Sequence, residues 1–405
     1  MSVAPASWVH SRTLALAVAS IATGTSASGQ TPPAPRIRDS AGVRIVEHAA
    51  IRNAPAAFTI ADRPSLDLGG LRNNPDAEFN SGAPFLTAKR LSDGRVVTTD
   101  NSSLKIFDRD GKFVRNVGRK GSGPGEFNQV LDVCVAPGDT LIAVPYSAPR
   151  IVVFDSAGRH VRTLATAGYP GSDPCFADGS VLFRTHTEVN PATTMPRELA
   201  AAFDRRVTVT RYPPSAMPSA IVGQFPSGNE SATFSTKGNI VVRHDSIYAG
   251  NGEAASVAVY SAAGTLARVI RWNDPRTPIT DGVLDEKGLS SVPMNASASV
   301  IAALKRRARA RPHQANVPAY WAIKVDAAGR IWIQDYPFRH TRPYGWTVFD
   351  GAGRLLGRVA LPHIAAAESR TIELVDIGND FVVLCWRDKA DGAAHISFHA
   401  LTRTT

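Results

Sequence analysis

The sequence of 405 residues predicts an all-β fold made of repeated four-stranded antiparallel sheets. The first observation is a recurring hairpin phrase, in which an apolar strand ends in Phe-Asp-x-x-Gly and a second strand follows. The phrase is clearest at residues 150–162 and returns, with variations, at residues 104–115, 257–268 and 346–358. Tight turns favour Gly and Asp, whereas Val, Ile and aromatic residues favour the flanking strands.

The second observation is another turn phrase, with a Gly between two apolar strands. Its six copies cover residues 91–97, 136–142, 176–182, 235–241, 326–332 and 376–382. The two phrases alternate along the chain, so each unit holds two hairpins, and 47 residues separate Phe107 from Phe154. A period in the forties with four strands is typical of a β-propeller blade, which buries its faces only against neighbouring blades. Six copies therefore predict a six-bladed β-propeller.

The two ends of the chain are expected to close the propeller. The last unit, residues 371–402, has room for three strands, whereas residues 58–68 form a strand phrase before the first complete unit. We expect the N-terminal strand to complete the last blade, because this arrangement leaves no open sheet edge at the seam.

An insertion at residues 272–316 interrupts the strand pattern. A helix is expected near residues 297–310, with Val300, Ile301 and Leu304 on its apolar side and a basic C-terminal end that suits the helix dipole. Two interpretations stay open. The helix packs on the outside of the propeller with solvated charges, or it forms a lid or anion-contacting arm over one face.

A family resemblance supports the blade count. Residues 117–164, with Gly121-Ser-Gly-Pro-Gly-Glu126-Phe127 before the two strand phrases, resemble an NHL-type repeat of a six-bladed β-propeller. The whole chain resembles exported bacterial six-bladed propellers of unassigned role. The resemblance implies a sixth blade closed by strands from the N- and C-termini.

The N-terminus has the features of a secretory signal. His10 and Arg12 precede an apolar run at residues 14–21, which is too short to span a bilayer, and small residues follow at 24–29. We predict a signal peptide at residues 1–29, a flexible leader at 30–41 and the propeller at 42–405. The mature protein is expected in the periplasm or outside the cell, without a transmembrane segment.

Cysteine spacing and charge exclude some classes of protein. Cys134, Cys175 and Cys385 lie far apart, so the sequence contains no Cys-x-x-Cys metal or redox motif. A disulfide between Cys134 and Cys175 is an open alternative, and buried free thiols are the preferred interpretation. The net charge of +10 is scattered, which favours a solvated surface over a binding site for RNA or another polyanion.

Candidate site residues follow from the repeat, since propellers bind ligands at the mouth of the central channel. Polar residues stand five to seven positions past each Gly turn, and slightly later in the last unit. These residues are Asp100, Tyr146, Arg184, His186, Arg243, His244, Asp335 and Arg387. We expect them to form one ring around a polar pocket, unless opposite charges of adjacent blades pair and seal the core. We expect Trp321, Trp332, Trp346 and Trp386 to pack in the core between blades.

These observations favour a binding protein over an enzyme. We expect a monomer that binds a protein, peptide or glycan without catalysis and without a cofactor or metal; nucleic acid is disfavoured by export. The alternative is a metal-dependent hydrolase or lactonase that uses Asp100, His186, His244 and Asp335. Because His and Arg share the predicted ring, its chemistry does not suit a hard cation. The sequence also contains neither a Gly-x-Ser-x-Gly nor a His-Glu-x-x-His motif.

Overall fold

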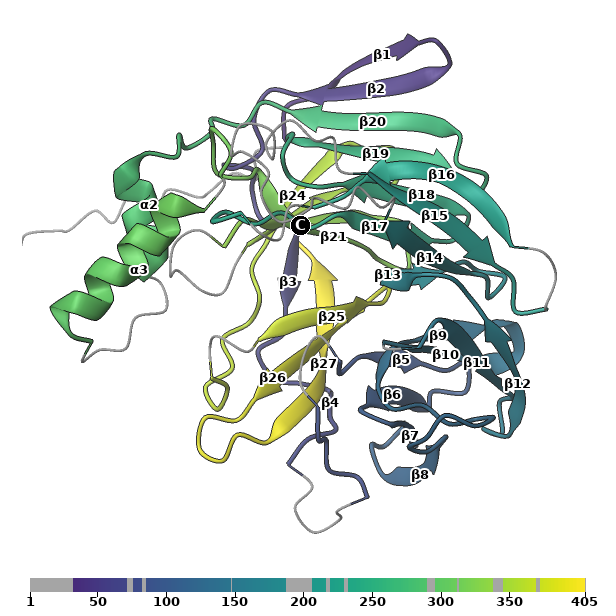
Figure 1. Cartoon of the computed structure of the whole chain (residues 1–405). Helices are drawn as coiled ribbons and strands as arrows, with labels where there is room; N and C mark the ends of the chain where they lie inside the picture. Colours follow the sequence, from purple (N-terminus) through teal and green to yellow (C-terminus); the bar gives the residue numbers. More distant parts are fainter. Residues whose placement is uncertain are drawn as a thin grey trace, which may run out of the picture. The chain divides into compact units, whose positions relative to one another are not determined.

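Strands form six sheets in the described part of the chain, and we name these sheets blades A to F (Figure 1). The computed structural model describes residues 32–70, 76–81, 85–146, 148–186, 206–215, 219–228, 232–289, 296–311, 313–337, 345–368 and 372–404. The predicted signal peptide lies outside the described residues. The fold confirms an all-β six-bladed propeller built from four-stranded antiparallel sheets, with additional strands in two of them.

In each blade, the strands are given in order from the innermost strand to the outermost. Blade A contains β5 (Ala88–Arg90), β6 (Val96–Asp100), β7 (Ser103–Phe107) and β8 (Phe113–Val117). Blade B contains β9 (Val130–Ala136), β10 (Thr140–Pro145), β11 (Arg150–Phe154) and β12 (His160–Ala165). Blade C contains β13 (Tyr169–Cys175), β14 (Val181–His186), β15 (Arg206–Tyr212) and β16 (Ala220–Pro226).

The other three blades follow the same order. Blade D contains β17 (Asn239–Arg243), β18 (Ser246–Gly250), β19 (Ser256–Ser261) and β20 (Leu266–Trp272). Blade E contains β21 (Tyr320–Val325), β22 (Ile331–Asp335), β23 (Trp346–Phe349) and β24 (Leu355–Val359). Blade F contains β25 (Glu373–Ile377), β26 (Phe381–Arg387) and β27 (Ala394–Arg403), together with strands from the N-terminal part of the chain.

The Phe-Asp-x-x-Gly phrase forms the outer hairpin of a blade. In the β11–β12 turn, Asp155 Oδ1 accepts a hydrogen bond of 2.8 Å from the Arg159 amide, and Asp350 Oδ1 accepts one of 2.8 Å from the Arg354 amide in the β23–β24 turn. Gly353 adopts a φ of +88°, which favours glycine. The phrase recurs because Asp caps the turn and Gly supplies its left-handed backbone.

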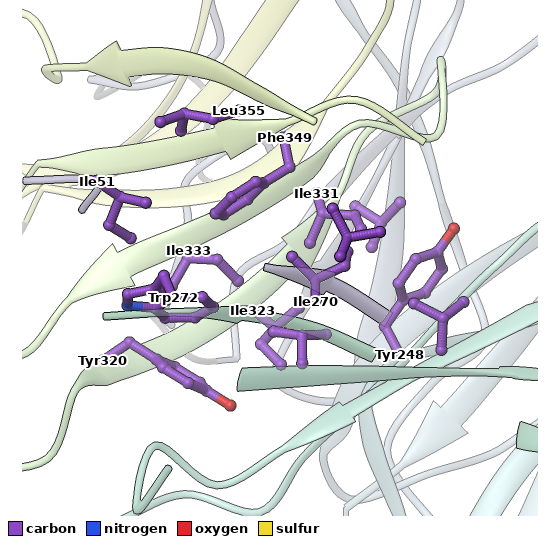
Figure 2. Packing of buried hydrophobic residues seen from close by; sticks show 14 of the residues in the cluster. Ile51, Tyr248, Ile270, Trp272, Tyr320, Ile323, Ile331, Ile333, Phe349 and Leu355 are labelled. Atoms are coloured by element: carbon purple, nitrogen blue, oxygen red, sulfur yellow. The ribbon is translucent and has the colours of Figure 1, made fainter. Parts of the chain in front are cut away.

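Six buried hydrophobic clusters lie between neighbouring blades, one at each of the six junctions. Figure 2 shows the junction of blades D and E, where Tyr248 and Ile270 of blade D pack with Ile331, Ile333 and Phe349 of blade E. Each large apolar side chain buried in this way contributes roughly 1.5–3 kcal/mol. Because every blade shares a cluster with both of its neighbours, the ring is closed.

Strands from the beginning of the chain complete blade F, as the sequence predicts. β3 (Phe58–Ile60) and β4 (Leu66–Asp67) both pair antiparallel with β27. Leu401 lies opposite Ile60, and Ser397 lies opposite Asp67. The N-terminal and C-terminal parts of the chain thus share one sheet.

Two further strands extend blade D to six strands, which the sequence did not predict. β1 (Arg36–Ser40) pairs antiparallel with β2 (Val43–His48), and β2 pairs parallel with β20. The buried Val46 joins the cluster between blades D and E, and His48 Nε2 lies 2.8 Å from the Gly353 carbonyl oxygen. Residues 36–40, which were expected within a flexible leader, are therefore a strand, because this pairing and packing order them.

The described residues between β20 and β21 contain two helices. The helices are α2 (Asp281–Gly288) and α3 (Ala298–Ala310). The residues that precede them, Thr280 and Ser297, are their N-caps, and each side chain accepts a hydrogen bond from a backbone amide of the first turn. α3 lies where the sequence predicts a helix, and α2 is an addition. In the described residues, no helix combines the length and the apolarity that crossing a bilayer requires.

Two basic residues in the C-terminal half of α3 contact α2. Arg309 forms two hydrogen bonds of 2.7 and 2.8 Å with the carboxylate of Asp285 on α2, and Lys305 Nζ lies 3.5 Å from the same carboxylate. Thr233 donates a hydrogen bond of 2.6 Å to the Ala308 carbonyl. The helix pair is thereby attached to the loop that precedes β17.

Candidate functional site

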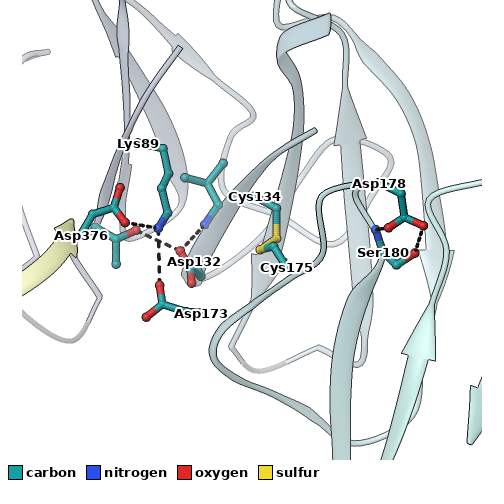
Figure 3. Close-up of a disulfide and its surroundings, with 10 residues drawn as sticks. Lys89, Asp132, Cys134, Asp173, Cys175, Asp178, Ser180 and Asp376 are labelled. Carbon is teal, nitrogen blue, oxygen red and sulfur yellow. Dashed lines mark hydrogen bonds and ion pairs between the residues drawn. A yellow bond between two sulfur atoms is a disulfide. The ribbon is translucent and has the colours of Figure 1, made fainter. Parts of the chain in front are cut away.

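Five ionisable side chains meet near the centre of the ring, and we name them the hub cluster: Lys89, Asp132, Asp173, Lys324 and Asp376. They come from β5, β9, β13, β21 and β25, the innermost strands of five blades. Lys89 Nζ lies 2.9 Å from Asp376 Oδ1 and 3.4 Å from Asp173 Oδ1 (Figure 3). Lys324 Nζ lies 3.0 Å from Asp173 Oδ2. These ion pairs connect blades A, C, E and F across the centre.

An irregularity in β13 brings Asp173 into the cluster. Pro170 pairs with Phe183 and Cys175 pairs with Val181, so residues 171–174 bulge opposite a single residue. Asp173 itself adopts a left-handed φ of +46°, which costs roughly 1–2 kcal/mol for a residue with a side chain. The two lysines that hold its carboxylate compensate for this strained backbone.

A disulfide between Cys134 and Cys175 fastens the bulged strand to blade B (Figure 3). The Cα atoms are 5.7 Å apart, within the range that a disulfide bridges. The preference for free thiols at these two positions is therefore wrong, because the bulge places Cys175 beside Cys134 on β9. Cys385 is buried and lies outside this disulfide.

Burial and neighbouring charges separate the pKa values of the hub carboxyls. Burial raises the pKa of Asp132 to about 6; Lys89 opposes this shift and Asp173 adds to it. Burial alone would also raise the pKa of Asp173, but Lys324 and Lys89 hold it well below its usual range. Burial lowers the pKa of Lys89, and the carboxylates of Asp376, Asp173 and Asp132 outweigh that effect and raise it. Asp132 is thus a hub carboxyl that titrates near neutral pH.

Two cavities adjoin the hub cluster, and Asp173 lines both of them. The first, which we name the Trp321 cavity, has a volume of about 160 Å³ and also contacts Asp132 and Lys324. The second, which we name the His244 cavity, has a volume of about 450 Å³ and also contacts Lys89. The hub cluster therefore lies where the two cavities meet.

The Trp321 cavity is lined by residues at the inner strands of all six blades, and in blade E the lining continues to Gln334 and Trp346. Trp321 is half-buried, and the Lys237 ammonium lies 4.4 Å from the centre of its ring. Asn239 spans blades D and E, because its amide donates to the Trp321 carbonyl at 3.2 Å and accepts from the Ile323 amide at 3.2 Å. These contacts fix one wall of the cavity.

Several polar groups of this cavity are unused in the described residues. The indole Nε1 of Trp346 is buried without a hydrogen-bond partner. No hydrogen bond to the side-chain amide of Gln334 is found among the described residues, and Gln334 lies directly opposite Trp346 in the β22–β23 pair. Glu373 adds an exposed carboxylate at the rim. Buried polar groups are nearly always satisfied in folded proteins, so this cavity has the chemistry of a binding site.

Three basic side chains of the His244 cavity have partners within the protein. Arg243 Nε donates to the Asp326 carbonyl at 3.1 Å, and His244 Nε2 donates to the Ala327 carbonyl at 3.2 Å. The guanidinium of Arg90 lies 4.3 Å from the centre of the Phe381 ring. These contacts connect neighbouring blades.

Two predicted site carboxylates have structural partners. Asp100 is buried, accepts hydrogen bonds of 2.9 Å from each of the Asn80 and Ser81 amides, and lies 3.5 Å from Lys105 Nζ. Asp335 Oδ1 accepts a hydrogen bond of 3.0 Å from Arg358 Nη1. Both carboxylates pair with a cation of their own blade, so neither forms the pairing between adjacent blades that was the alternative.

Four other predicted residues lie at the ends of second strands or just beyond them. The Tyr146 ring is 5.2 Å from that of Phe85, and Arg184 Nη1 donates to the Gly238 carbonyl at 3.0 Å. Arg387 lines a separate cavity of about 380 Å³. The side chain of His186, at the end of β14, lies outside the described residues.

Arg243 and His244 lie at the opposite end of their blade, so the predicted single ring is wrong. In blade D the Gly238 phrase precedes β17, and the turn after β17 contains His244 with a φ of +53°. First and second strands of a blade are antiparallel, so the end of one lies opposite the end of the other. Asp100, His186, His244 and Asp335 therefore do not share one site. Among the described residues, no three His, Cys, Asp or Glu side chains are grouped to hold a metal.

The hub cluster was missed because its members precede the turn Gly, on the innermost strand. Lys89 and Lys324 stand five residues before that Gly, and Asp132 and Asp173 stand six residues before it. Asp376 stands two residues before Gly378. A charged residue inside an otherwise apolar strand, counted backward from each turn, is the signal that identifies four of the five.

The four tryptophans that were expected in the core differ in their burial and in their hydrogen bonds. Trp332, Trp346 and Trp386 are at most 4% exposed, as expected for core residues, whereas Trp321 lines a cavity. The indole N–H groups of Trp332 and Trp386 donate to Asp326 Oδ2 at 2.8 Å and to Ser397 Oγ at 3.0 Å. Trp346 differs from these two in having no such acceptor.

Comparisons with known proteins agree with this fold. Residues 90–178 match the model of a family described as 6-bladed beta-propeller, DUF5128. A presumed exported protein of Bacteroides fragilis is similar in structure, with a TM-score of 0.50, 12% identity, and coverage of 89% of this chain and 100% of that chain. A member of the DUF4221 family from Bacteroides vulgatus has a TM-score of 0.51, 9% identity, and coverage of 86% and 99%. At these identities the likeness concerns the fold alone. A comparison with curated proteins finds no significant match.

Proposed function

We propose that the protein is an exported, monomeric, NHL-type propeller that binds a polar ligand, a peptide or glycan, in the Trp321 cavity without transforming it. The observation that carries the proposal is the half-buried indole of Trp321 beside the Gln334 side-chain amide, for which the described residues provide no hydrogen-bond partner. A ligand that supplies a partner to Gln334 gains a hydrogen bond in a site that is largely pre-formed.

Binding without catalysis is supported by the state of the hub carboxylates. Asp173 and Asp376 each lie within 3.4 Å of an ammonium group, and Asp132 accepts hydrogen bonds from Thr87 Oγ1 at 3.3 Å and from the Val133 amide at 2.8 Å. A carboxylate that serves as a base or nucleophile has to leave such partners, which is costly for a buried ion pair. The cluster is therefore suited to holding the blades in place.

The NHL-type assignment is supported by the loop that enters blade B. Glu126 accepts hydrogen bonds of 2.9 Å from the Gly123 amide and 2.8 Å from Arg119 Nε, and Phe127 is fully buried. The Gly-rich segment and its Glu-Phe thus have structural roles in joining two blades. This loop is the part of the sequence that resembles the NHL repeat.

Export is supported by the signal-like residues 1–29 and by the disulfide, because disulfides persist mainly in oxidising compartments. The proposed organisation keeps a signal peptide at 1–29 and moves the start of the propeller from residue 42 to residue 36, because residues 36–40 form the outer edge of blade D. Mass spectrometry of the mature protein tests this organisation. An intact N-terminus in the exported fraction would contradict it.

Ligand binding is tested with a panel of neutral and charged saccharides and of short peptides. Thermal shift and tryptophan fluorescence report binding, and mass spectrometry of the mixtures reports any turnover. We expect Trp321→Ala to abolish binding of every ligand found, and His244→Ala, in the other cavity, to leave it intact. Equal affinity in the wild type and Trp321→Ala would refute this location, and accumulation of a product would refute the non-catalytic part.

A further inference from the structure

The basic end of α3, which includes its C-cap residue, carries two kinds of cationic side chain. Lys305 and Arg309 pair with Asp285 on α2, so their charges hold the two helices together (Figure 1). The other three side chains, which we name the arginine patch, are exposed and form no hydrogen bond or ion pair in the described part of the chain: Arg306, Arg307 and Arg311. The fold does not use these three side chains, so they can contact a partner.

An excess of positive charge surrounds the arginine patch. Residues 281–311 contain six Lys or Arg residues and three Asp or Glu residues. Two of these three, Asp281 and Asp285, already pair with Arg309, and Asp285 also pairs with Lys305. The guanidinium group of arginine binds carboxylates in a planar, bidentate manner. The arginine patch is therefore complementary to a partner that has several carboxylate groups.

The loop that precedes β17 attaches this end of α3 to the propeller. Thr233 donates a hydrogen bond of 2.6 Å to the carbonyl of Ala308, the residue that follows the first two arginines of the patch. Phe234, the next residue of the loop, packs in a buried cluster with Leu284 of α2 and with Val317. These contacts fix the position of the arginine patch relative to the loop.

The same loop also forms part of the Trp321 cavity. The ammonium group of Lys237 lies 4.4 Å from the centre of the Trp321 ring, and the Tyr336 ring lies 5.7 Å from that ring. Tyr336 packs against the buried cluster under α2, and its hydroxyl donates a hydrogen bond of 2.8 Å to the Ser235 carbonyl. Four residues of chain span at most about 14 Å, so the Cα atom of Lys237 lies within that distance of the Cα atom of Thr233. The cavity and the arginine patch are therefore neighbouring surfaces.

A ligand that contacts both surfaces has to be extended and flexible. An extended peptide advances about 3.3 Å per residue, so about five residues reach from the cavity to the patch. Gln334 offers a donor and an acceptor to a peptide group, and Trp321 offers an apolar surface. Consecutive residues of a helix project roughly 100° apart, so Arg306 and Arg307 point in different directions. Carboxylates on the flexible side chains of Glu or Asp can reach both, whereas those of uronic acids are fixed to rigid rings.

From these observations we propose that the ligand is an acidic peptide, which places one end in the Trp321 cavity and its carboxylates on the arginine patch. The inference rests on the proposed binding function and specifies its ligand and a second contact surface. The cavity selects the shape of the ligand, and the arginine patch selects its charge. Because the patch is exposed to solvent, salt screens its contribution.

Matched peptides give the first test. The probes are Ala-Ala-Ala-Glu-Glu-Glu and Glu-Glu-Glu-Ala-Ala-Ala, with the corresponding Gln peptides as neutral controls and trigalacturonic acid as an acidic saccharide. Titration calorimetry of the mature protein gives each Kd, and the indole N–H signal of Trp321 in ¹⁵N–¹H spectra reports occupation of the cavity. We expect one Glu peptide to shift this signal and to bind about fivefold to tenfold more tightly than its Gln counterpart at low ionic strength. At about 1 M salt, this preference should fall to within about twofold.

Variants of the arginine patch locate the selectivity for charge. Replacing all three patch arginines by Gln leaves the ion pairs of Lys305 and Arg309 in place, and it should reduce the preference for the Glu peptide to within about twofold. The matched control replaces by Gln three exposed arginines of other blades whose side chains likewise have no partner among the described residues: Arg109, Arg162 and Arg354. The control has the same net charge as the patch variant and should keep the full preference.

The outcomes separate this inference from the broader function. Equal affinities for the Glu and Gln peptides in the wild type, or the same loss of preference in both triple variants, overturn the acidic ligand. Unchanged affinity of the Glu peptide in Trp321→Ala overturns the joint site, and tighter binding of trigalacturonic acid than of either Glu peptide overturns the choice of a peptide. In the first case, a neutral probe that still shifts the Trp321 signal leaves the proposed function in place. If no probe, charged or neutral, shifts that signal, both proposals fail.

Discussion

The Trp321 cavity and the His244 cavity share Asp173 and differ in how their polar groups are used. The larger His244 cavity, about 450 Å³, is lined by Arg243 and His244, which donate to backbone carbonyls of blade E. The smaller Trp321 cavity, about 160 Å³, is lined by the side chain of Gln334, for which no hydrogen-bond partner is found among the described residues. The comparison teaches that unused polar groups indicate a binding site better than volume does, because satisfied groups gain little from a ligand.

The largest effect on stability is expected when the carboxylate of Asp173, which lines both cavities, is removed. Asp173→Asn deprives Lys89 and Lys324 of a buried carboxylate, and we expect the free energy of unfolding to fall by about 3–5 kcal/mol. Urea unfolding followed by tryptophan fluorescence measures the change. Asp178→Asn weakens a surface pair with Arg211 and the local hydrogen bonds that Asp178 accepts from Ser180, and it should cost less than about 1 kcal/mol. Similar losses in both variants would show that the hub cluster is no more stabilising than a surface pair.

Opening the disulfide affects mainly the His244 side, which both cysteines line. The bond closes a loop across a sequence separation of 41 residues, so Cys134→Ser with Cys175→Ser should lower the free energy of unfolding by about 2–4 kcal/mol. Denaturant unfolding with and without reductant measures this loss. Reductant should lower the wild type to the level of the double variant and leave the double variant unchanged. Loss of ligand binding by the folded double variant would contradict the separation of the two cavities.

A pH titration isolates Asp132, which lines the Trp321 cavity but not the His244 cavity. Its pKa in the folded protein, about 6, exceeds the ordinary value of 3.8. The protonated form is therefore favoured by folding, and its stabilising contribution is complete below pH 3.8 and lost as the pH rises to about 6. Relative to Asp132→Asn, the wild type should lose about 3 kcal/mol across this window. A difference in unfolding free energy that stays constant with pH would contradict the raised pKa.

The smallest effect is expected for substitution of His244, which lines the His244 cavity. His244 is exposed, adopts a left-handed φ of +53°, and makes one hydrogen bond of 3.2 Å with the Ala327 carbonyl. His244→Ala should change the free energy of unfolding by less than about 1 kcal/mol and leave ligand affinity within twofold. Thermal denaturation and fluorescence titration measure the two quantities. A large loss of affinity would indicate that the ligand binds in the His244 cavity and not in the Trp321 cavity.

Local turn chemistry explains why the fold could be predicted. Asp155 and Gly158 form their turn whatever the rest of the chain does, because the Asp caps an amide four residues away. The same logic failed at Gly238, which precedes β17 and does not lie in the turn after it. The parallel pairing of β2 with β20 was also missed, since it joins residues 44–48 to residues 268–272 without a local signal.

The candidate site was harder to predict because it depends on contacts between blades. Lys89 and Asp376 are far apart in the sequence and meet only when the ring closes. The bulge that places Asp173 and Cys175 depends on strand pairing, so the disulfide stayed an open alternative. The unused N–H of Trp346 depends on which neighbours do not reach it, and no residue pattern records that.

The shared sheet of blade F has a consequence for biogenesis. Ile60 pairs with Leu401, so a chain that emerges from the ribosome N-terminus first keeps β3 and β4 without their final partner until almost the whole polypeptide has been made. Joining segments so distant in sequence is entropically slow, and the waiting strands expose backbone groups that invite mispairing. The last step of maturation is then a zippering of the two chain ends. A circularly permuted gene that begins between two intact blades would remove this delay.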